Sequence, residues 1–192
     1  GADLVGLGVA SFSHVGGTMR DNLPSDPWHG YFKLPGWYQQ LLDQGALGQK
    51  AKRGVYQKQG KDIHVLDLGT KNYRLSAGKA DDAVKELLRE RNWGKKLAGL
   101  RASNHPQAQF VWSSLRDVLH YCAVQLENIA DNARDLDFAV RWGFGWDAGP
   151  FEIWQAAGWQ QVARWIAEDI AAGKALAATP LPAWVTDPAR TG

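Results

Sequence analysis

The sequence predicts a mostly helical protein with one small β-hairpin. Apolar residues recur at helical spacing in several stretches, of which the longest covers residues 104–130. One short region suits paired strands instead, because residues 55–56 and 63–66 flank a turn at Gly60. An isolated two-stranded hairpin is marginal in water, so this one must lean on helices. We therefore expect helices that pack around one long helix, with the hairpin beside them.

The composition is that of an ordinary folded chain. Its 192 residues suffice for one domain or two small ones, and a hydrophobic content of 45% supports a core. The net charge of +2 gives no reason to expect a nucleic-acid partner. Basic residues gather at 50–53 and 89–96 with acidic or apolar residues between them, so we interpret both as solvated faces. The ten tryptophans are expected to pack in the core and at interfaces.

Several absences narrow the function. Cys122 is the only cysteine, so no internal disulfide can form, which fits a reducing compartment. No apolar run has membrane-spanning length and no signal-like segment leads the chain, so we expect a cytoplasmic protein without a membrane span. The glycine pairs at 6 and 8 and at 143 and 145 are too short to replace the Gly-x-Gly-x-x-Gly fingerprint. A dinucleotide-binding fold is therefore not visible in this sequence.

The first half of the chain is predicted to contain two helices and the hairpin. The first helix covers residues 1–22, and Gly16-Gly17 within it indicates either a close neighbour or a break. Prolines mark residues 22–35 as a loop, after which a short helix ends at Gly45. Residues 67–79 are expected to be a polar connection.

The second half is predicted to be helical throughout. Helices are expected at residues 80–91, 104–130, 136–142, 150–158 and 160–172, with a short turn at 95–100. Asn104 is expected to cap the longest helix, and Asp135 the helix that follows it. The apolar stripe of the longest helix comprises Val111, Leu115, Val118, Leu119, Cys122, Leu126 and Ile129. Residues 174–192 contain three prolines and are expected to form either a linker or a strap over the body.

A glycine-rich corner precedes one of these helices. Gly143 and Gly145 are expected to frame the turn, because a residue without Cβ adopts left-handed backbone angles at little cost. Gly149 then precedes Pro150, which suits the first helical turn, and Glu152 faces the positive end of the helix dipole. The corner by itself is compatible with plain helix packing and no chemistry.

Residues 137–152 also resemble the C-terminal helical domain of 3-hydroxyacyl-CoA dehydrogenases, in which an Asp, a short helix, a Gly-Phe-Gly corner and a Gly-Pro pair occur in this order. A second segment supports the resemblance. The family has a Gly-x-x-Gly-x-Lys-x-Gly-x-Gly-Phe-Tyr connector, which this chain matches at Gly45, Gly48, Lys50, Gly54 and Tyr56. Lys52 replaces a glycine of that pattern, and Val55 replaces a phenylalanine.

The start of the chain shows a third similarity. Residues 3–7 match an Asp-x-Val-Gly-Leu element of the family, and Gly8 replaces its second acid. Residues 155–159 echo residues 3–7, and each of the two segments precedes a helix, which indicates two copies of one helical unit. For Lys50 we favour a structural role over a phosphate-binding one, since phosphate binding would need a nest of backbone N–H groups around it.

The resemblance implies a fold and a set of boundaries. The fold is expected to be mostly α, like the C-terminal domain of 6-phosphogluconate dehydrogenase, with a duplicated unit and a small β-hairpin. Residues 1–53 would be the end of the first helical repeat with the glycine-rich connector, and 54–78 the hairpin and a linker. Residues 79–173 would be the second repeat, and 174–192 a proline-containing tail.

The resemblance also implies a function. The family oxidises the 3-hydroxyl of a hydroxyacyl-CoA in β-oxidation and passes hydride to NAD, with catalytic residues in a Rossmann nucleotide-binding domain. That domain is not visible here, so the chain is expected to be an inactive fragment that lines the substrate cleft. Its expected partners are the missing Rossmann domain, acyl-CoA and, in a homodimer, a second copy. The alternative is a stand-alone helical interaction module without catalysis.

No catalytic, cofactor-binding or metal-binding residue is assigned in this chain. His120 and Cys122 lie two positions apart on a helix and point in different directions, so a thiol–imidazole pair is not expected. The five histidines are isolated in sequence, so metal binding is unsupported. The ten residues singled out have structural roles: Gly45, Gly48, Lys50, Gly54, Tyr56, Gly143, Gly145, Gly149, Pro150 and Glu152.

Overall fold

The chain divides into two compact units, Gly1–Lys79 and Ala80–Gly192. The computed structural model describes residues 8–48, 50–76, 78–187 and 189, so the predicted element at residues 3–7 lies outside them. Most of these residues are helical, and a single three-stranded sheet occurs among them. The predicted class, mostly helical with a small sheet, is confirmed. Within the described residues, every helix is too short or too polar to cross a bilayer.

The first unit begins with two helices around a small core. Helices α2 (Gly8–Asn22) and α3 (Gly36–Asp43) are joined by a loop that contains the 3-10 helix η1 (His29–Phe32). Helix α2 runs through Gly16-Gly17 without a break, and a Cβ at Gly16 would lie 3.4 Å from the Phe32 carbonyl oxygen. The glycine therefore permits the close approach of η1. The core residues are Val9, Tyr38, Leu41 and Ala46.

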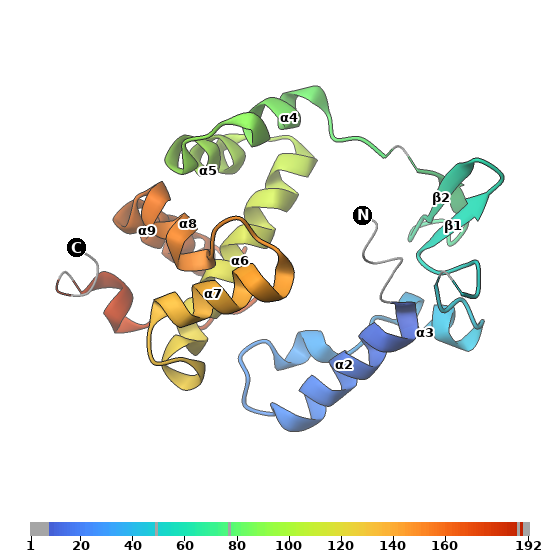
Figure 1. Cartoon of the computed structure of the whole chain (residues 1–192), viewed down its shortest axis with the longest axis horizontal. Helices are drawn as coiled ribbons and strands as arrows, with labels where there is room; N and C mark the ends of the chain where they lie inside the picture. The colour runs from blue at the N-terminus through green and yellow to red at the C-terminus, as the bar shows by residue number, and fades with distance from the viewer. Residues whose placement is uncertain (1–7, 49, 77, 188, 190–192) are drawn as a thin grey trace. The chain divides into compact units, whose positions relative to one another are not determined.

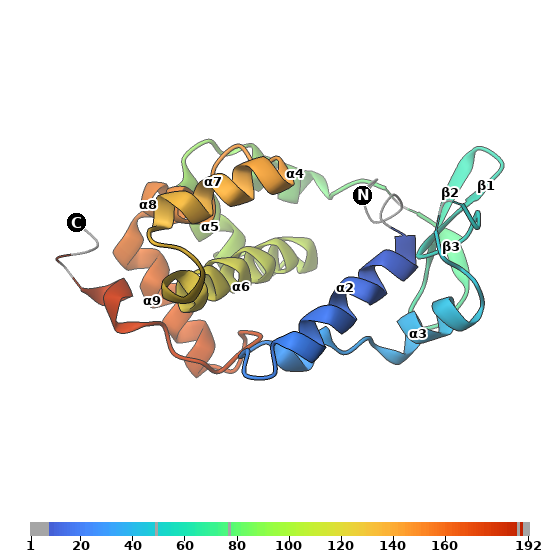
Figure 2. The same ribbon diagram turned by 60° about the horizontal axis from the view of Figure 1, so that its bottom comes forward.

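The sheet of the first unit has three antiparallel strands in the order β1 (Tyr56–Gln59), β2 (Asp62–Leu66) and β3 (Tyr73–Leu75) (Figure 2). Residue pairs such as Tyr56 with Val65 and Leu66 with Tyr73 set the register. The prediction that residues 67–79 form only a connection was wrong, because β3 lies within it. A strand of three residues is too short for its alternation to be detected in a sequence.

The glycine-rich connector of the first unit is a tight loop closed by two backbone hydrogen bonds. The Gly48 N–H donates to the Arg53 carbonyl at 2.8 Å, and the Arg53 N–H donates back at 3.2 Å. Gly45 and Gly48 have φ of 65° and 121°, and a Cβ at Gly54 would lie 3.0 Å from the Gly48 Cα. Lys52, at a position where the resembled family has glycine, has a left-handed φ of 57°. The backbone there is of the kind that favours glycine.

The second unit places its longest helix, α6 (Pro106–Ile129), against several others (Figure 1). The remaining elements are α4 (Asp82–Arg89), α5 (Trp93–Ala102), α7 (Ala133–Phe144), α8 (Pro150–Ala157), α9 (Trp159–Ala171) and the 3-10 helix η2 (Ala183–Thr186). Leu119, Cys122 and Leu126 of the predicted stripe are buried, but Ile129 is 66% exposed at the last position of α6. Arg116, Asp117 and His120 are buried as well. Other elements of the unit therefore cover α6 at polar positions as well as at apolar ones.

Two predicted helix caps were displaced. His105, and not Asn104, caps α6, because its Nδ1 accepts from the Gln107 N–H at 3.2 Å and Pro106 follows it. Asn132, and not Asp135, caps α7, because its Oδ1 accepts from the Asp135 N–H at 3.0 Å. The predicted short turn at 95–100 lies within α5, a full helix of 10 residues.

The corner between α7 and α8 differs from the prediction at one glycine. Gly145 ends α7 in the left-handed conformation with φ 68°, as expected of a helix C-cap. Gly143 lies inside α7 and does not frame the turn. Helix α8 begins at Pro150, and the Glu152 Oε2 accepts from the Gly149 N–H at 2.6 Å. The expected helix-start roles of Pro150 and Glu152 are confirmed.

A residue of α7 caps the start of α8. Asp137 is buried, and its two carboxylate oxygens accept from the Phe151 and Glu152 N–H groups at 2.8 and 3.0 Å. A Cβ at Gly149 would lie 2.3 Å from the Asp137 Cβ. Gly149 is therefore required because the capping side chain passes directly against its backbone.

The segment after α9 lies along the helices. The Arg116 Nη2 donates to the Lys174 carbonyl at 2.7 Å, and the Trp159 Nε1 donates to the Val185 carbonyl at 2.7 Å. The Leu176 N–H donates to the Asp117 Oδ1 at 3.2 Å. The two alternatives for this segment were a linker and a strap over the body. The contacts of residues 174–187 are those of a strap.

We predict that Gly149→Ala will destabilise the second unit by about 2–4 kcal/mol. The new Cβ displaces Asp137, so two charge-assisted hydrogen bonds are lost and the corner is overpacked. Urea denaturation followed by circular dichroism would measure the change. The matched control is Gly143→Ala, at a helical position with no atom within 4 Å of the new Cβ, which should stabilise by about 0.5–1 kcal/mol. Equal effects of the two substitutions would refute the role of Asp137.

We predict that Lys52→Gly will stabilise the first unit by roughly 0.5–1 kcal/mol. The substitution relieves the left-handed φ of 57°, which costs a residue with Cβ about 1–2 kcal/mol. Part of this gain is offset because glycine raises the conformational entropy of the unfolded chain. Native-state hydrogen exchange of peptides that cover β1 to β3 would measure it. Lys50→Gly, two residues away and without a positive φ, should instead lower protection.

Candidate functional site

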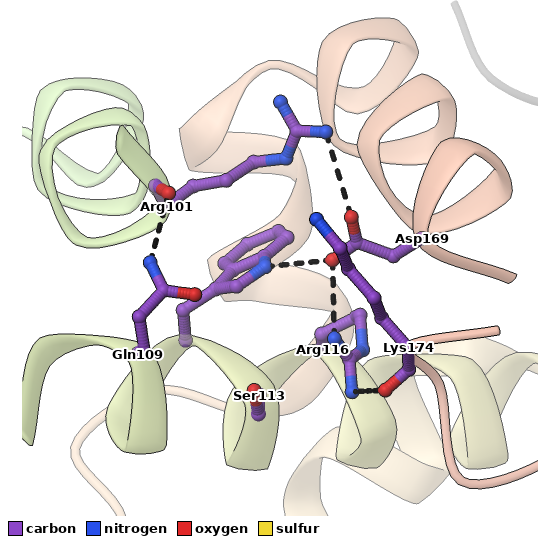
Figure 3. A pocket seen from close by; sticks show the side chains of 7 residues that line it. Arg101, Gln109, Ser113, Arg116, Asp169 and Lys174 are labelled. Carbon is purple, nitrogen blue, oxygen red and sulfur yellow. Dashed lines mark hydrogen bonds and ion pairs between the residues drawn. The ribbon is translucent and has the colours of Figure 1, made fainter. Parts of the chain in front are cut away.

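A polar cavity of about 440 Å³ lies beside α6 in the second unit (Figure 3). Helix α5 contributes Arg101, α9 contributes Asp169, and Lys174 comes from the segment after α9. Helix α6 contributes a set of four residues, namely Gln109, Trp112, Ser113 and Arg116. The lining therefore contains three cationic side chains and a single carboxylate.

The base of the cavity is a buried ion network. Arg116 is 2% exposed, and its Nη1 donates to the Asp169 Oδ2 at 3.1 Å. Its Nε and Nη2 donate to the two oxygens of Asp117 at 3.1 and 2.9 Å. The Trp112 indole N–H donates to the Asp169 Oδ2 at 2.8 Å. All of these groups are buried and mutually satisfied, so the base is rigid.

The network fixes the charge states of its members. Burial alone would raise the pKa of Asp169, but hydrogen bonds from Trp112 and Arg116 hold that pKa below its ordinary value of 3.8. Burial would lower the pKa of Arg116, but Asp117 and Asp169 raise it above its ordinary value. Asp169 is consequently ionised at neutral pH and already occupied by donors. It is poorly suited to act as a general base.

The rim of the cavity carries cations that are less fully paired. The Arg101 Nη2 donates to the Glu168 Oε2 at 2.7 Å and lies 3.5 Å from the Asp169 Oδ1. The Arg101 guanidinium also lies over the Trp165 ring at 5.6 Å. Its Nε is buried and has no acceptor among the described residues. The Lys174 side chain extends into the cavity (Figure 3).

A second, more apolar concavity of about 580 Å³ lies over α7, α8 and η2. Phe138, Phe151, Trp159 and Trp184 are among the residues that line it, together with Asp137 and Glu152. Burial raises the pKa of Asp137, whereas the two backbone N–H groups that it accepts oppose this shift. The carboxylates of Asp137 and Glu152 both accept hydrogen bonds from backbone N–H groups at the start of α8. This concavity therefore offers an apolar surface and no free carboxylate.

Two large aromatic side chains near the end of α7 are exposed. Trp142 is 80% exposed and stacks on Phe138 with ring centroids 5.1 Å apart, and Phe144 is 78% exposed. The guanidinium groups of Arg134 and Arg141 lie 5.1 and 5.8 Å from the centre of the Phe138 ring. Exposed aromatic and arginine side chains of this kind are enriched at interfaces.

The ten residues singled out from the sequence lie in two separate groups. Gly45, Gly48, Lys50, Gly54 and Tyr56 belong to the connector and sheet of the first unit. The other five, Gly143, Gly145, Gly149, Pro150 and Glu152, belong to the corner of the second unit. None of the ten lines the polar cavity, and Glu152 lines the apolar one.

The residues of the polar cavity and the cap made by Asp137 were not predicted from the sequence. No distinct signal for the cavity is present in the sequence, because Arg116 and Asp117 lie beside the apolar stripe of the longest helix, where charged residues are ordinary. Charged residues at such positions indicate either an exposed face or a buried pair. Their partner Asp169 lies 53 residues from Arg116 along the chain, so the sequence could not decide between these alternatives.

His120 and Cys122 do not form a reactive pair. The His120 Nε2 donates to the Thr179 carbonyl at 2.8 Å, and burial lowers the pKa of its imidazole. Burial raises the pKa of the Cys122 thiol to about 12, so a thiolate is not available near neutral pH. Among the residues with described positions, no group of three or more His, Cys, Asp and Glu side chains could hold a metal ion.

Comparison with known proteins gives one informative similarity. The chain is 32% identical over 157 residues to a "Probable 3-hydroxyacyl-CoA dehydrogenase" of Bacillus subtilis (strain 168). The match covers 82% of this chain but only 20% of that protein, so the chain spans about a fifth of the length of its relative. The resemblance seen in the sequence motifs is confirmed. No family model matches the chain, and no solved structure matches it.

We predict that the contribution of Asp169 to stability will be lost in acid. Its pKa is lower in the folded than in the unfolded state, so the contribution is complete above the ordinary value of 3.8 and is lost as the pH falls through the folded value. At pH 7, Asp169→Asn should cost about 3–5 kcal/mol, because it leaves Arg116 with one carboxylate. Urea denaturation between pH 7 and pH 2.5 would measure both proteins.

The difference between the wild type and Asp169→Asn should shrink as the pH falls below 3.8. Glu86→Gln is the matched control, since its ion pair with Arg89 is exposed and the substitution should have little effect at any pH. A wild-type advantage that stays constant down to pH 2.5 would contradict the assigned ionisation.

Proposed function

We propose that this chain is a helical part of a 3-hydroxyacyl-CoA dehydrogenase and that it forms one wall of the acyl-CoA cleft. In this proposal a Rossmann domain outside the sequence binds NAD and supplies the catalytic residues. The observation that carries it is the match over 82% of the chain to only a fifth of a probable 3-hydroxyacyl-CoA dehydrogenase. Neither cavity of the second unit presents a free acid–base pair, which is compatible with catalytic groups that come from elsewhere.

The fold proposed for this part is that of the 6-phosphogluconate dehydrogenase C-terminal domain, with a duplicated helical unit. Residues 1–53 would end the first repeat, 54–78 would form the sheet and linker, 79–173 the second repeat and 174–192 its tail. The division of contacts between Lys79 and Ala80 supports the boundary before the second repeat. The corner with Gly145, Gly149 and Pro150 supports the assignment because each of these residues has a definite backbone role.

The exposed side chain of Trp142 on α7, which stacks on Phe138, is the proposed docking surface for the Rossmann domain or for a second copy. Trp142 exposes most of its side chain, and burial of such side chains dominates the energy of many interfaces. The proposed setting is the cytoplasm, where acyl-CoA and NAD are both available to the enzyme. A stand-alone interaction module remains the competing proposal, and the following experiment separates the two.

A chimera tests the function directly. In the Bacillus relative, the stretch that matches this chain is replaced by the chain itself, and a second variant lacks the stretch altogether. We expect the chimera to reduce NAD with a 3-hydroxyacyl-CoA and the deletion variant to show no activity, because the cleft would lack a wall. NADH absorbance at saturating NAD would follow the reaction. An inactive but folded chimera would favour the stand-alone module.

Two controls sharpen this test. Trp142→Ala in the chimera should lower activity about tenfold or more if Trp142 is an interface hot spot, whereas Phe110→Ala, at another highly exposed aromatic residue on α6, should not. The isolated chain should show no saturable energy transfer from its tryptophans to NADH. Saturable binding at micromolar NADH would place a nucleotide site in this chain and contradict the proposal.

A further inference from the structure

Hydrogen-bond donors without acceptors surround the polar cavity on three sides. Within the part of the chain that the structure describes, the Lys174 ammonium has no carboxylate oxygen within 4.0 Å and makes no hydrogen bond. The Ser113 hydroxyl also has no partner among these residues, and the Arg101 Nε is buried without an acceptor. Of these three donors the Arg101 Nε is buried, whereas Ser113 is half-buried and Lys174 is exposed. A buried donor without a partner in a native protein indicates that a water molecule or an ion completes its hydrogen bonds.

The acceptors that line this cavity are already occupied. The Asp169 Oδ2 accepts from Trp112 and Arg116, and its Oδ1 faces the Arg101 Nη2 at 3.5 Å. Two further carboxylates stand behind the lining, where Asp117 pairs with Arg116 and Glu168 pairs with Arg101. The charge of Arg101 is thus balanced by Glu168, and the charge of Arg116 by Asp117 and Asp169. The charge that has no counter-ion is the Lys174 ammonium.

We propose that this cavity binds the phosphate group of a phosphorylated ligand. Lys174 supplies the unmatched positive charge, and the Arg101 Nε and the Ser113 hydroxyl supply directed donors. A phosphate group offers three acceptor oxygens on one centre, which suits a cavity lined by donors from α5, α6 and the segment after α9. The volume of about 440 Å³ is in the range of small-molecule sites and leaves room for the group attached to the phosphate.

The identity of the ligand rests on the proposed function. If the chain serves an acyl-CoA enzyme, the phosphate is the one on the ribose of CoA. Inorganic phosphate has the same chemistry and is the other source. The two sources are separated by comparing CoA with dephospho-CoA, which differs from it only by this phosphate.

Isothermal titration of the isolated chain at low salt tests the site. We expect inorganic phosphate and CoA to bind, and CoA to bind more tightly than dephospho-CoA. Lys174→Ala should weaken the binding of both phosphate and CoA about tenfold or more, and Lys174→Arg should restore most of it. The substitution should preserve the fold, because the Lys174 carbonyl and not its side chain accepts from Arg116. Circular dichroism and thermal unfolding would verify this.

Lys95→Ala is the matched control, since it removes the same charge near the opposite end of α5 from Arg101. Binding of phosphate that depends on Lys174, with CoA and dephospho-CoA equal, supports the site and assigns it to inorganic phosphate. Equal losses in the two alanine variants indicate nonspecific attraction and overturn the proposal. An absence of any binding overturns it too and assigns the cavity to water.

The result is independent of the chimera. Phosphate binding to the isolated chain can fail while the chimera stays active, and the chimera can fail while phosphate still binds. Failure of the phosphate site is therefore distinguishable from failure of the proposed function.

Discussion

A guanidinium that is withdrawn from water must be matched by carboxylates at hydrogen-bond distance, and this constraint organises the second unit. Arg116 meets Asp117 from its own helix, Asp169 from α9 and a carbonyl from the segment that follows. An unmatched buried charge costs several kcal/mol, so α6 is stable only when these elements arrive together. Apolar contacts such as those of Val162 and Ile166 tolerate more variation. The polar network therefore selects one arrangement of α9 against α6.

The corner between α7 and α8 solves a related problem. A helix start leaves backbone N–H groups without partners, and those of α8 are satisfied by a carboxylate from the preceding helix. Because Asp137 reaches these groups across the turn, Gly149 cannot carry a side chain. The order Asp, glycine corner, Gly-Pro is thus one physical unit. This accounts for a sequence motif shared with the 3-hydroxyacyl-CoA dehydrogenases without any appeal to chemistry.

Local signals in the sequence predicted the local structure well. The left-handed Gly145, the helix start at Pro150 and the burial of Leu119 and Leu126 all follow from turn chemistry and helical spacing. Contacts between distant residues could not be predicted this way. Strand β3 forms only because β2 offers it an edge, and the carboxylate of Asp169 becomes a partner of Arg116 only after folding.

The candidate site illustrates the same limit. Its residues come from α5, α6, α9 and the strap, and they are spread over positions 101–174. They therefore form no recognisable sequence motif. In the sequence, Arg116 and Asp117 lie beside the apolar stripe of the longest helix and look like ordinary solvated residues. Whether a charged residue is solvated or paired depends on which other elements pack over it, and this is decided only when the chain folds.

The strap also bears on the order in which the unit can form during synthesis. Residues 174–185 supply carbonyl groups to Arg116, His120 and Trp159, all of which are made earlier. While residues 174–185 are still inside the ribosome, a nascent chain with α4 to α9 outside would lack these carbonyl acceptors and would leave the Trp159 indole uncovered by η2, although Asp117 and Asp169 can already pair with Arg116. Such a chain is a natural client for a chaperone, and its final compaction waits for translation of the strap.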